Sequence, residues 1–333
     1  MRLIKKAVIH TETKRLSNYY TMLDGILYGN VWPHKHKTYC YIQDEIQVIL
    51  RNSCASHNFT PFRSGNETYA LGGMDAWKFE EKWKLIDDYN EFKKAFLSRF
   101  KTEYTRDIER FEMFKERIRK KISLAHSDGL YLFRKTVTGW QQMFDSPVIT
   151  VHHPGFISAL DYGKSSEFDG QPSIVFRDGL FYLYLRYNVK FKTRFIQYAT
   201  SKNLIDWSSF KSIEISGYDF DEENYYMPNF FEYKNYILGL VPYFRGDVAC
   251  LRLLKSTDGR KFSIENDILP SQVAMLSKNA PKNPIVPVHG MAYKKGFAFL
   301  FLHENYLGIH KKEPVEIVQY KIHTKDFENA YNL

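Results

Sequence analysis

Three side chains suited to proton transfer stand just ahead of expected β-strands. Asp169 lies three residues before Pro172, and His57 lies four residues before Pro61. Glu223 ends an acidic stretch that also holds an aspartate and a glutamate directly before it. Carboxyl and imidazole groups are the usual general acids and bases, and imidazole titrates near neutral pH. These residues therefore predict acid–base or hydrogen-bonding chemistry at the entrances of strands.

The element that must position Asp169 is a three-stranded unit between residues 167 and 207. Strands are expected at 173–176, 180–187 and 194–200. The first two are joined by the turn Arg177-Asp178-Gly179, and a polar turn ending at Trp207 closes the unit. Short alternating strands separated by such turn residues are typical of antiparallel sheets.

The same unit recurs along the chain. The offset from the strand-opening proline to the closing aromatic residue is 35, 34 and 40 residues, for 172–207, 228–262 and 287–327. The pair 61–140 fits once an insertion is removed, and strands at 25–31, 38–42 and 46–50 form a further meander. Three or four strands per unit are typical of β-propellers. In such a fold the closing aromatic residue of each unit is predicted to fill the gap to the neighbouring unit. We predict an all-β chain, a five-bladed β-propeller forming a single domain over residues 1–333, with a two-domain β-sandwich as the alternative.

Residues 75–124 interrupt this pattern. The stretch lacks glycine and proline up to residue 122, and its apolar residues recur every three or four positions. We predict a long α-helical insertion in an early blade. The helix can pack on the side of the propeller, cover the mouth of the site, or pair with a second copy to form a homo-oligomer. Its fourteen basic against ten acidic residues over 78–121 make a surplus too small to predict nucleic-acid binding.

Two closing turns carry a family resemblance. The turns Thr200-Ser201-Lys202-Asn203-Leu204-Ile205-Asp206-Trp207 and Ser256-Thr257-Asp258-Gly259-Arg260-Lys261-Phe262 resemble the blade-closing turns of five-bladed propeller glycosidases. That superfamily includes glycoside hydrolase families 32, 43, 62 and 68. The stretch from His57 to Phe244 is most similar to a glycosidase-like branch whose members read H-N-F-x-P-F and F-D-S-Q-N-V-x-F-W-D. The resemblance implies a fold more strongly than an activity, because closing turns are structural.

The resemblance also implies roles. It places Asp169 where these propellers carry an orienting carboxylate and Glu223 where they carry the general acid, a role in which Asp219, Asp221 or Glu222 could substitute. Their first catalytic blade carries an aspartate before proline, but this chain has His57-Asn58 instead. Three explanations stay open: His57 is the base, a carboxylate such as Asp24 or Asp75 is recruited, or the protein binds glycan without cleaving it. In the last case it would serve in the recognition or synthesis of a surface polysaccharide.

Other polar residues at equivalent strand positions are candidate ligands for a carbohydrate. Amides and imidazole can bond sugar hydroxyls, and arginine suits the carboxylate or phosphate of an acidic glycan. The candidates at strand starts are Asn58, Gln171, Asn229 and His289, and those at strand ends are Arg186 and Arg245.

Composition sets the outer limits. The 333 residues carry a net charge of +9, which permits an acidic partner. No apolar run approaches the length of a membrane span, and the basic N-terminus lacks a cleavage site. The sequence therefore predicts a cytoplasmic location or leaves the location undetermined. Three cysteines and the pair His34 and His36 do not make a disulfide framework or a zinc site. We expect neither a metal nor a cofactor.

Overall fold

The computed structural model of this protein describes thirteen stretches of the chain. They are residues 4–12, 17–31, 37–42, 45–51, 58–74, 129–157, 168, 170–190, 193–219, 222–245, 248–271, 285–304 and 314–333. The predicted helical insertion, residues 75–124, lies outside the described residues, as do Asp169 and His57.

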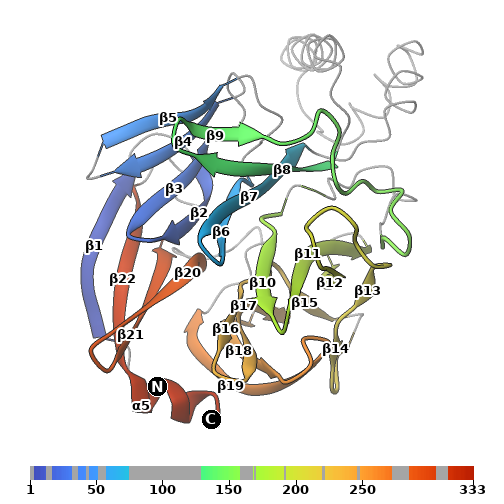
Figure 1. The fold of residues 1–333 in the computed structure, drawn as a ribbon. Helices are drawn as coiled ribbons and strands as arrows, with labels where there is room; N and C mark the ends of the chain where they lie inside the picture. The colour runs from blue at the N-terminus through green and yellow to red at the C-terminus, as the bar shows by residue number, and fades with distance from the viewer. Residues whose placement is uncertain are drawn as a thin grey trace, which may run out of the picture.

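The described chain is almost entirely β-structure (Figure 1). Its strands are β1 (Ile4–Glu12), β2 (Ser17–Leu23), β3 (Ile26–Val31), β4 (Lys37–Ile42), β5 (Glu45–Arg51), β6 (Thr60–Ser64), β7 (Glu67–Met74), β8 (Gly129–Thr136), β9 (Gly139–Gln142), β10 (Ser173–Arg177), β11 (Leu180–Lys190), β12 (Thr193–Ser201), β13 (Lys211–Ser212), β14 (Glu214–Ile215), β15 (Glu223–Tyr225), β16 (Phe230–Tyr233), β17 (Tyr236–Arg245), β18 (Val248–Ser256), β19 (Lys261–Ser271), β20 (Val286–Lys294), β21 (Phe297–Glu304) and β22 (Val315–His323). One helix, α5 (Thr324–Ala330), ends the chain. Within the described stretches, no helix is long and apolar enough to cross a membrane.

The strands form four hydrogen-bonded sheets in a β-propeller arrangement. Three sheets are built from β6–β9, β10–β13 and β14–β19, and the fourth has eight strands in the order β1-β22-β21-β20-β2-β3-β4-β5. The two halves of that sheet are antiparallel and meet at one parallel pair, Thr21 with His289. The N-terminal strand β1 pairs with the C-terminal strand β22, so the two ends of the chain share one sheet.

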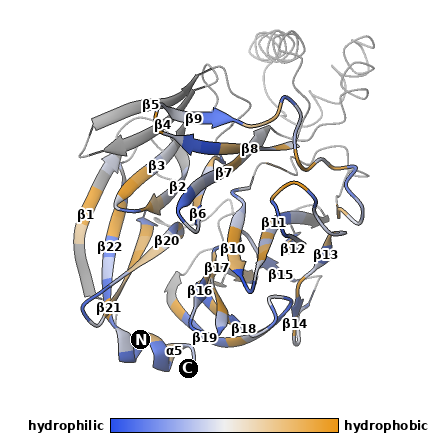
Figure 2. Cartoon of the chain, viewed as in Figure 1, coloured by the Kyte–Doolittle hydropathy of each residue, from blue (hydrophilic) through white to orange (hydrophobic). Residues whose placement is uncertain are grey.

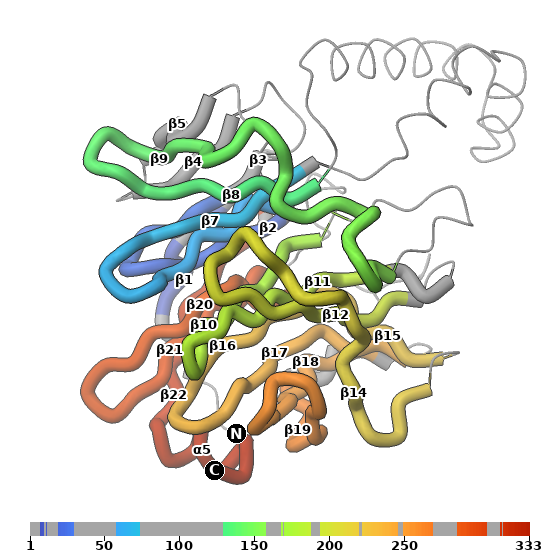
Figure 3. The backbone as a smooth tube through the Cα atoms, turned by 45° about the vertical axis from the view of Figure 1, so that its right-hand side comes forward, coloured from blue at the N-terminus to red at the C-terminus, as the bar shows by residue number. Residues whose placement is uncertain are grey.

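The first strands of successive units lie next to one another in a closed cycle. β2 contacts β6, β6 contacts β10, β10 contacts β16, β16 contacts β20, and β20 contacts β2. Figures 1 and 3 show the meanders following one another around this common centre. Residues at the starts of these inner strands therefore come from distant parts of the sequence and gather at one end of the central axis.

Hydrophobic side chains hold the units together face to face. Figure 2 shows hydrophobic segments on β1, β3 and β22 of the eight-stranded sheet and on β10 of another sheet. The closing aromatic residues pack toward the preceding unit. Trp140 lies edge-on to Tyr28, Phe262 lies edge-on to Tyr184, and Trp207 belongs to the same buried cluster as Phe62. Phe327 of α5 likewise packs on Tyr233 of the unit before it. The prediction that these aromatics fill the gaps between neighbouring units is confirmed.

The two closing turns that carried the family resemblance share one hydrogen-bond pattern. Asn203 Oδ1 accepts from the backbone N–H groups of Ile205 and Asp206, and Asp258 Oδ1 accepts from those of Arg260 and Lys261. Ser201 and Ser256 each accept a backbone N–H three residues later. The acceptor side chains replace missing backbone partners in a tight turn. The third residue after each serine has a positive φ, 66° at Leu204 and 73° at Gly259, which glycine adopts with less strain.

Candidate functional site

Polar side chains from different units gather where the inner strands start. Asn58, Gln171, Asn229 and His289 are all buried, none more than 4% exposed. A buried polar group is costly unless it is hydrogen-bonded. The partners of these side chains therefore decide whether they belong to the protein's own framework or face a ligand.

Asn58 is held entirely by backbone groups. Its amide nitrogen donates to the carbonyl oxygens of Phe168, at 2.5 Å, and Gly170, at 3.5 Å. Its Oδ1 accepts from the backbone N–H of Gly73 at 2.9 Å. Asn58 thus connects the start of β6 to the start of β10. It binds the carbonyl groups of the two residues that flank residue 169 in the sequence.

Gln171 and Ser173 continue this pattern around the axis. The Gln171 amide donates to Thr21 Oγ1 at 2.7 Å, which links β10 to β2. Ser173 Oγ donates to the carbonyl of Phe230 at 3.1 Å and accepts from the N–H of the same residue at 2.9 Å, which links β10 to β16. These hydrogen bonds cross from one unit to another.

His289 is the last of the buried polar residues at the starts of the inner strands. Burial lowers the pKa of its imidazole to about 3, while the backbone carbonyl groups of Pro228 and Pro172 act in the opposite direction. The ring therefore stays neutral near pH 7, and its Nε2 has no hydrogen-bond partner among the described residues. We call Thr21, Asn58, Gln171, Ser173 and His289 the axial belt. Asn229 lies beside it, and its backbone carbonyl accepts from the N–H of Leu240.

Glu223 lies at the same end of the molecule but in a different setting. The short strand β15 pairs with the last residues of β17, beyond the point where β16 begins. Glu223 is buried, with 7% of its surface exposed. Its Oε1 accepts from the hydroxyl of Tyr243 at 2.7 Å, and its Oε2 accepts from the backbone N–H of Asp219 at 3.4 Å. A buried carboxylate with fixed orientation can transfer a proton or accept a hydrogen bond from a ligand.

The hydroxyl of Tyr243 belongs to a larger set of contacts that the sequence did not reveal. The guanidinium of Arg252 lies over the Tyr243 ring, 3.4 Å from its centroid. Arg252 also donates to the hydroxyl of Tyr225 at 2.9 Å and to both oxygens of Asp267. We call Glu223, Tyr225, Tyr243, Arg252 and Asp267 the Glu223 network. No motif signals it, because its members meet only through the strand register.

The two arginines predicted to bind an acidic glycan differ in their exposure and in their partners. Arg245 is exposed and forms an ion pair with Glu222, with N–O distances of 2.9 and 2.6 Å. Arg186 is buried and lies 5.7 Å from the centroid of the Tyr226 ring, which Arg194 approaches at 5.0 Å. Tyr226 thus brings two guanidinium groups into one region.

Gly170 explains how Arg186 can lie so close to the entrance of β10. A Cβ atom added at this glycine would lie 3.3 Å from the Cβ of Arg186. The absence of a side chain at residue 170 therefore lets the backbone beside Asn58 pack on the arginine.

The carboxylate Asp24, an alternative base, lies at the wrong end of its strand. It follows β2 in a turn and forms a 2.7 Å ion pair with Arg63 near the end of β6. Both side chains are about half exposed. Asp24 is thus separated from the strand starts by the length of the inner strands. The other alternative, Asp75, lies outside the described residues.

Metal and thiol chemistry receive no support from the described part of the chain. No three histidine, cysteine, aspartate or glutamate side chains there form a group that could hold a metal ion. Cys250 is a buried free thiol, and burial raises its pKa to about 12. A nucleophilic cysteine needs a lowered pKa, so Cys250 is suited to packing. His34 and His36 lie outside the described residues.

Known proteins resemble this chain in structure but not in sequence. No protein-family model matches the chain, and no curated protein matches its sequence. The endo-arabinase from Bacteroides thetaiotaomicron VPI-5482 aligns with a TM-score of 0.51 and 9% identity, over 96% of this chain and 99% of that one. The GH43_1 enzyme from Xanthomonas citri complexed with xylose gives 0.49 and 10% identity, over 94% and 89%. A GH32 β-fructofuranosidase from Bombyx mori in complex with sucrose gives 0.48 and 11%, over 96% and 61%.

Only the first of these scores exceeds 0.5, and all three identities are far below 25%. The endo-arabinase alignment therefore bears on the fold alone. It spans nearly the whole of both chains, which agrees with the propeller arrangement of the sheets. Activity has to be argued from the residues of this chain, because one fold hosts many functions.

Proposed function

We propose that this protein is a carbohydrate-active propeller of five blades that hydrolyses or transfers a glycosidic bond at the axial end where its inner strands start. The count of five takes the two halves of the eight-stranded sheet as separate blades. It is supported by the closed cycle of contacts among β2, β6, β10, β16 and β20. The likeness to an endo-arabinase supports the fold on which this proposal rests.

The observation that carries the proposal is the position of Asn58. Its side chain binds the carbonyl groups of Phe168 and Gly170, the residues on either side of Asp169. Asn58 is itself the chain neighbour of His57. One buried amide therefore ties together the two segments that carry two of the three predicted catalytic residues, and Glu223 lies at the same end of the axis.

In this proposal Glu223 is the general acid, Asp169 orients the substrate and His57 acts as base. Two carboxyl groups on opposite sides of the scissile bond are the usual requirement for glycoside hydrolysis. A histidine in place of one carboxylate keeps a titratable group available near neutral pH. Arg186 and Arg194, which both approach Tyr226, favour a substrate with a carboxylate or phosphate group.

The test is the variant Glu223→Gln assayed on a panel of neutral and acidic glycans. Glutamine keeps the shape but cannot donate the acid proton, so release of reducing sugar should fall by at least a hundredfold, about 3 kcal/mol of transition-state stabilisation. Glu214→Gln is the matched control, because Glu214 is 68% exposed and forms only a surface ion pair with Lys261. Unchanged turnover in Glu223→Gln would remove Glu223 from the mechanism.

A second candidate is a glycan-binding propeller without turnover. It is favoured by the burial of Glu223 and by the protein donors that already reach both of its carboxylate oxygens. This protein would show saturable glycan affinity and no product between about pH 4 and 8, the range in which carboxyl and imidazole groups titrate. Isothermal titration calorimetry paired with product analysis separates the two candidates.

A further inference from the structure

A chain of contacts leads from the outer edge of one blade to Glu223. Asp267 on β19 holds Arg252 on β18 with two N–O distances of 2.8 and 2.9 Å. Arg252 covers the ring of Tyr243 on β17, and Tyr243 donates to Glu223 on β15. Three contacts thus join four residues and cross the sheet one strand at a time.

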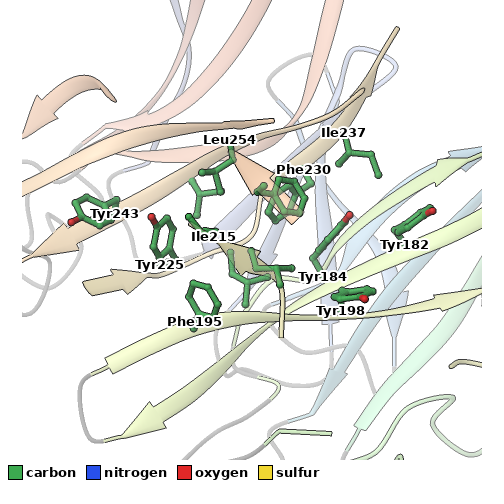
Figure 4. Packing of buried hydrophobic residues seen from close by; sticks show 14 of the residues in the cluster. Tyr182, Tyr184, Phe195, Tyr198, Ile215, Tyr225, Phe230, Ile237, Tyr243 and Leu254 are labelled. Carbon is green, nitrogen blue, oxygen red and sulfur yellow. The ribbon is translucent and has the colours of Figure 1, made fainter. Parts of the chain in front are cut away.

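Strand register explains why these side chains meet. Tyr225 pairs with Tyr243, and Arg252 pairs with Asp267, across antiparallel strands. Paired residues share a face of the sheet, and so does the residue two positions along the same strand. Glu223 is two positions from Tyr225 and thus lies on the face of the Tyr243 hydroxyl. Figure 4 shows the Tyr225 and Tyr243 rings next to one another in the buried cluster.

The contacts fix the direction of the Tyr243 hydroxyl. A guanidinium 3.4 Å from the ring centroid is a close cation–π contact, and its two bonds to Asp267 prevent it from moving away. Burial and the bond to Glu223 raise the pKa of Tyr243 to about 12, while Arg252 acts in the opposite direction. Tyr243 therefore keeps its proton at neutral pH and always donates.

We propose that Tyr243 is a positioning residue for Glu223 and that Arg252 holds Tyr243 in place for this purpose. The inference rests on the proposed function, since it assigns to the Glu223 network the task of aiming the candidate acid at the substrate. It adds Tyr243 and Arg252 to the candidate site, and neither residue lies at the start of an inner strand. It also gives a role to the largely buried guanidinium of Arg252, which is 11% exposed and is paired with the more exposed carboxylate of Asp267.

The test is Tyr243→Phe, which removes only the hydroxyl and leaves the ring beneath Arg252. Tyr184→Phe is the matched control, because Tyr184 is a buried tyrosine of the same cluster whose hydroxyl donates to the carbonyl of Gly259. The values of kcat, KM and the thermal midpoint are measured for both variants and for Glu223→Gln. A lost hydrogen bond to a charged group corresponds to a fall in kcat of about tenfold to a hundredfold. We expect this fall in Tyr243→Phe with KM within about twofold, and an unchanged kcat in Tyr184→Phe.

The outcomes separate the inference from the proposed function. A wild-type kcat in Tyr243→Phe, with Glu223→Gln inactive, overturns the positioning role and leaves the proposed function standing. An equal loss of kcat in both tyrosine variants, following their thermal midpoints, also overturns it. Full turnover in Glu223→Gln overturns the proposed function and the inference with it.

Two further readouts keep the inference open to refutation. Arg252→Lys cannot form the paired bonds to Asp267, so kcat should fall in the same direction as in Tyr243→Phe; no change would remove Arg252 from the proposal. If the wild-type protein binds glycan without turnover, Kd replaces kcat. Equal Kd values for wild type and Tyr243→Phe then contradict the positioning role, and the absence of both turnover and binding refutes both proposals.

Discussion

The axial belt and the Glu223 network are both polar and lie at the same end of the molecule, but the belt is buried throughout, whereas the Asp267 side chain of the network is 44% exposed. The two groups of residues differ in which strands their contacts connect. The belt joins strands of different blades, as in the contacts of Asn58 with Phe168 and of Gln171 with Thr21. The network stays within one blade, where Arg252, Tyr243 and Glu223 follow one another on neighbouring strands.

This difference separates side chains that hold the protein's own backbone from the side chain that we propose to act on a substrate. The Asn58 amide binds backbone groups on three sides, so its polar atoms satisfy the protein itself. Its value to a site is indirect, through the segments that it fixes. The Glu223 carboxyl group, in contrast, accepts hydrogen bonds from the Tyr243 hydroxyl and from the backbone N–H of Asp219, and these bonds orient it. A polar residue at a strand start is therefore not by itself a ligand for substrate.

The largest effect is expected from breaking the belt at Asn58. Asn58→Ala leaves the buried N–H of Gly73 and the carbonyl of Phe168 without their partner. Each unsatisfied buried group costs about 1–3 kcal/mol, so the free energy of unfolding should fall by about 3–5 kcal/mol. Urea denaturation measures it. Asn235→Ala, in an exposed turn, is the control and should change stability by less than about 0.5 kcal/mol. Similar values for both variants would show that the belt does not support the fold.

A smaller effect is expected from the pH dependence of the belt. Burial lowers the pKa of His289 from 6.5 to about 3. Below pH 6.5 the unfolded chain binds a proton that the folded protein excludes until about pH 3. This contribution to the free energy of unfolding therefore falls as the pH falls through that window, by up to about 1.4 kcal/mol per pH unit.

The variant His289→Gln removes this titration. Comparison with the variant cancels the effect of the other histidines, so the stability advantage of the wild type should shrink between pH 6.5 and pH 4.5. Urea denaturation at a series of pH values gives this difference. Parallel pH profiles of the two proteins would contradict a buried neutral imidazole.

The smallest effect is expected at the opposite end of the axis. Asp24 and Arg63 form an ion pair with both side chains about half exposed. Exposed pairs contribute about 0–1 kcal/mol, so Asp24→Asn should alter the free energy of unfolding by less than about 0.5 kcal/mol and leave turnover on glycans unchanged. A loss of turnover with intact stability would place the chemistry at the wrong end of the inner strands and reverse the comparison.

Much of the fold could be predicted from the sequence, because strand alternation and turn chemistry are local. The strands predicted at 173–176, 180–187 and 194–200 correspond to β10, β11 and β12. The closing aromatics were predicted to fill the gaps between units, and they do so because each blade must cover an apolar face. The pairing of β1 with β22 was missed, since nothing local marks an N-terminal strand as the partner of a C-terminal one.

The residues of the candidate site likewise fall into those that the sequence predicted and those that only the structure revealed. The sequence placed Asn58 and Gln171 at strand entrances, since a turn and the strand that follows it are encoded by neighbouring residues, and the resemblance to propeller glycosidases pointed to Glu223. Only the tertiary structure decided that the amides are held by distant backbone and that Tyr243 and Arg252 accompany Glu223. The reason is physical: a hydrogen-bond partner across a sheet or an axis depends on register and blade packing, and neither is a property of any short stretch of chain.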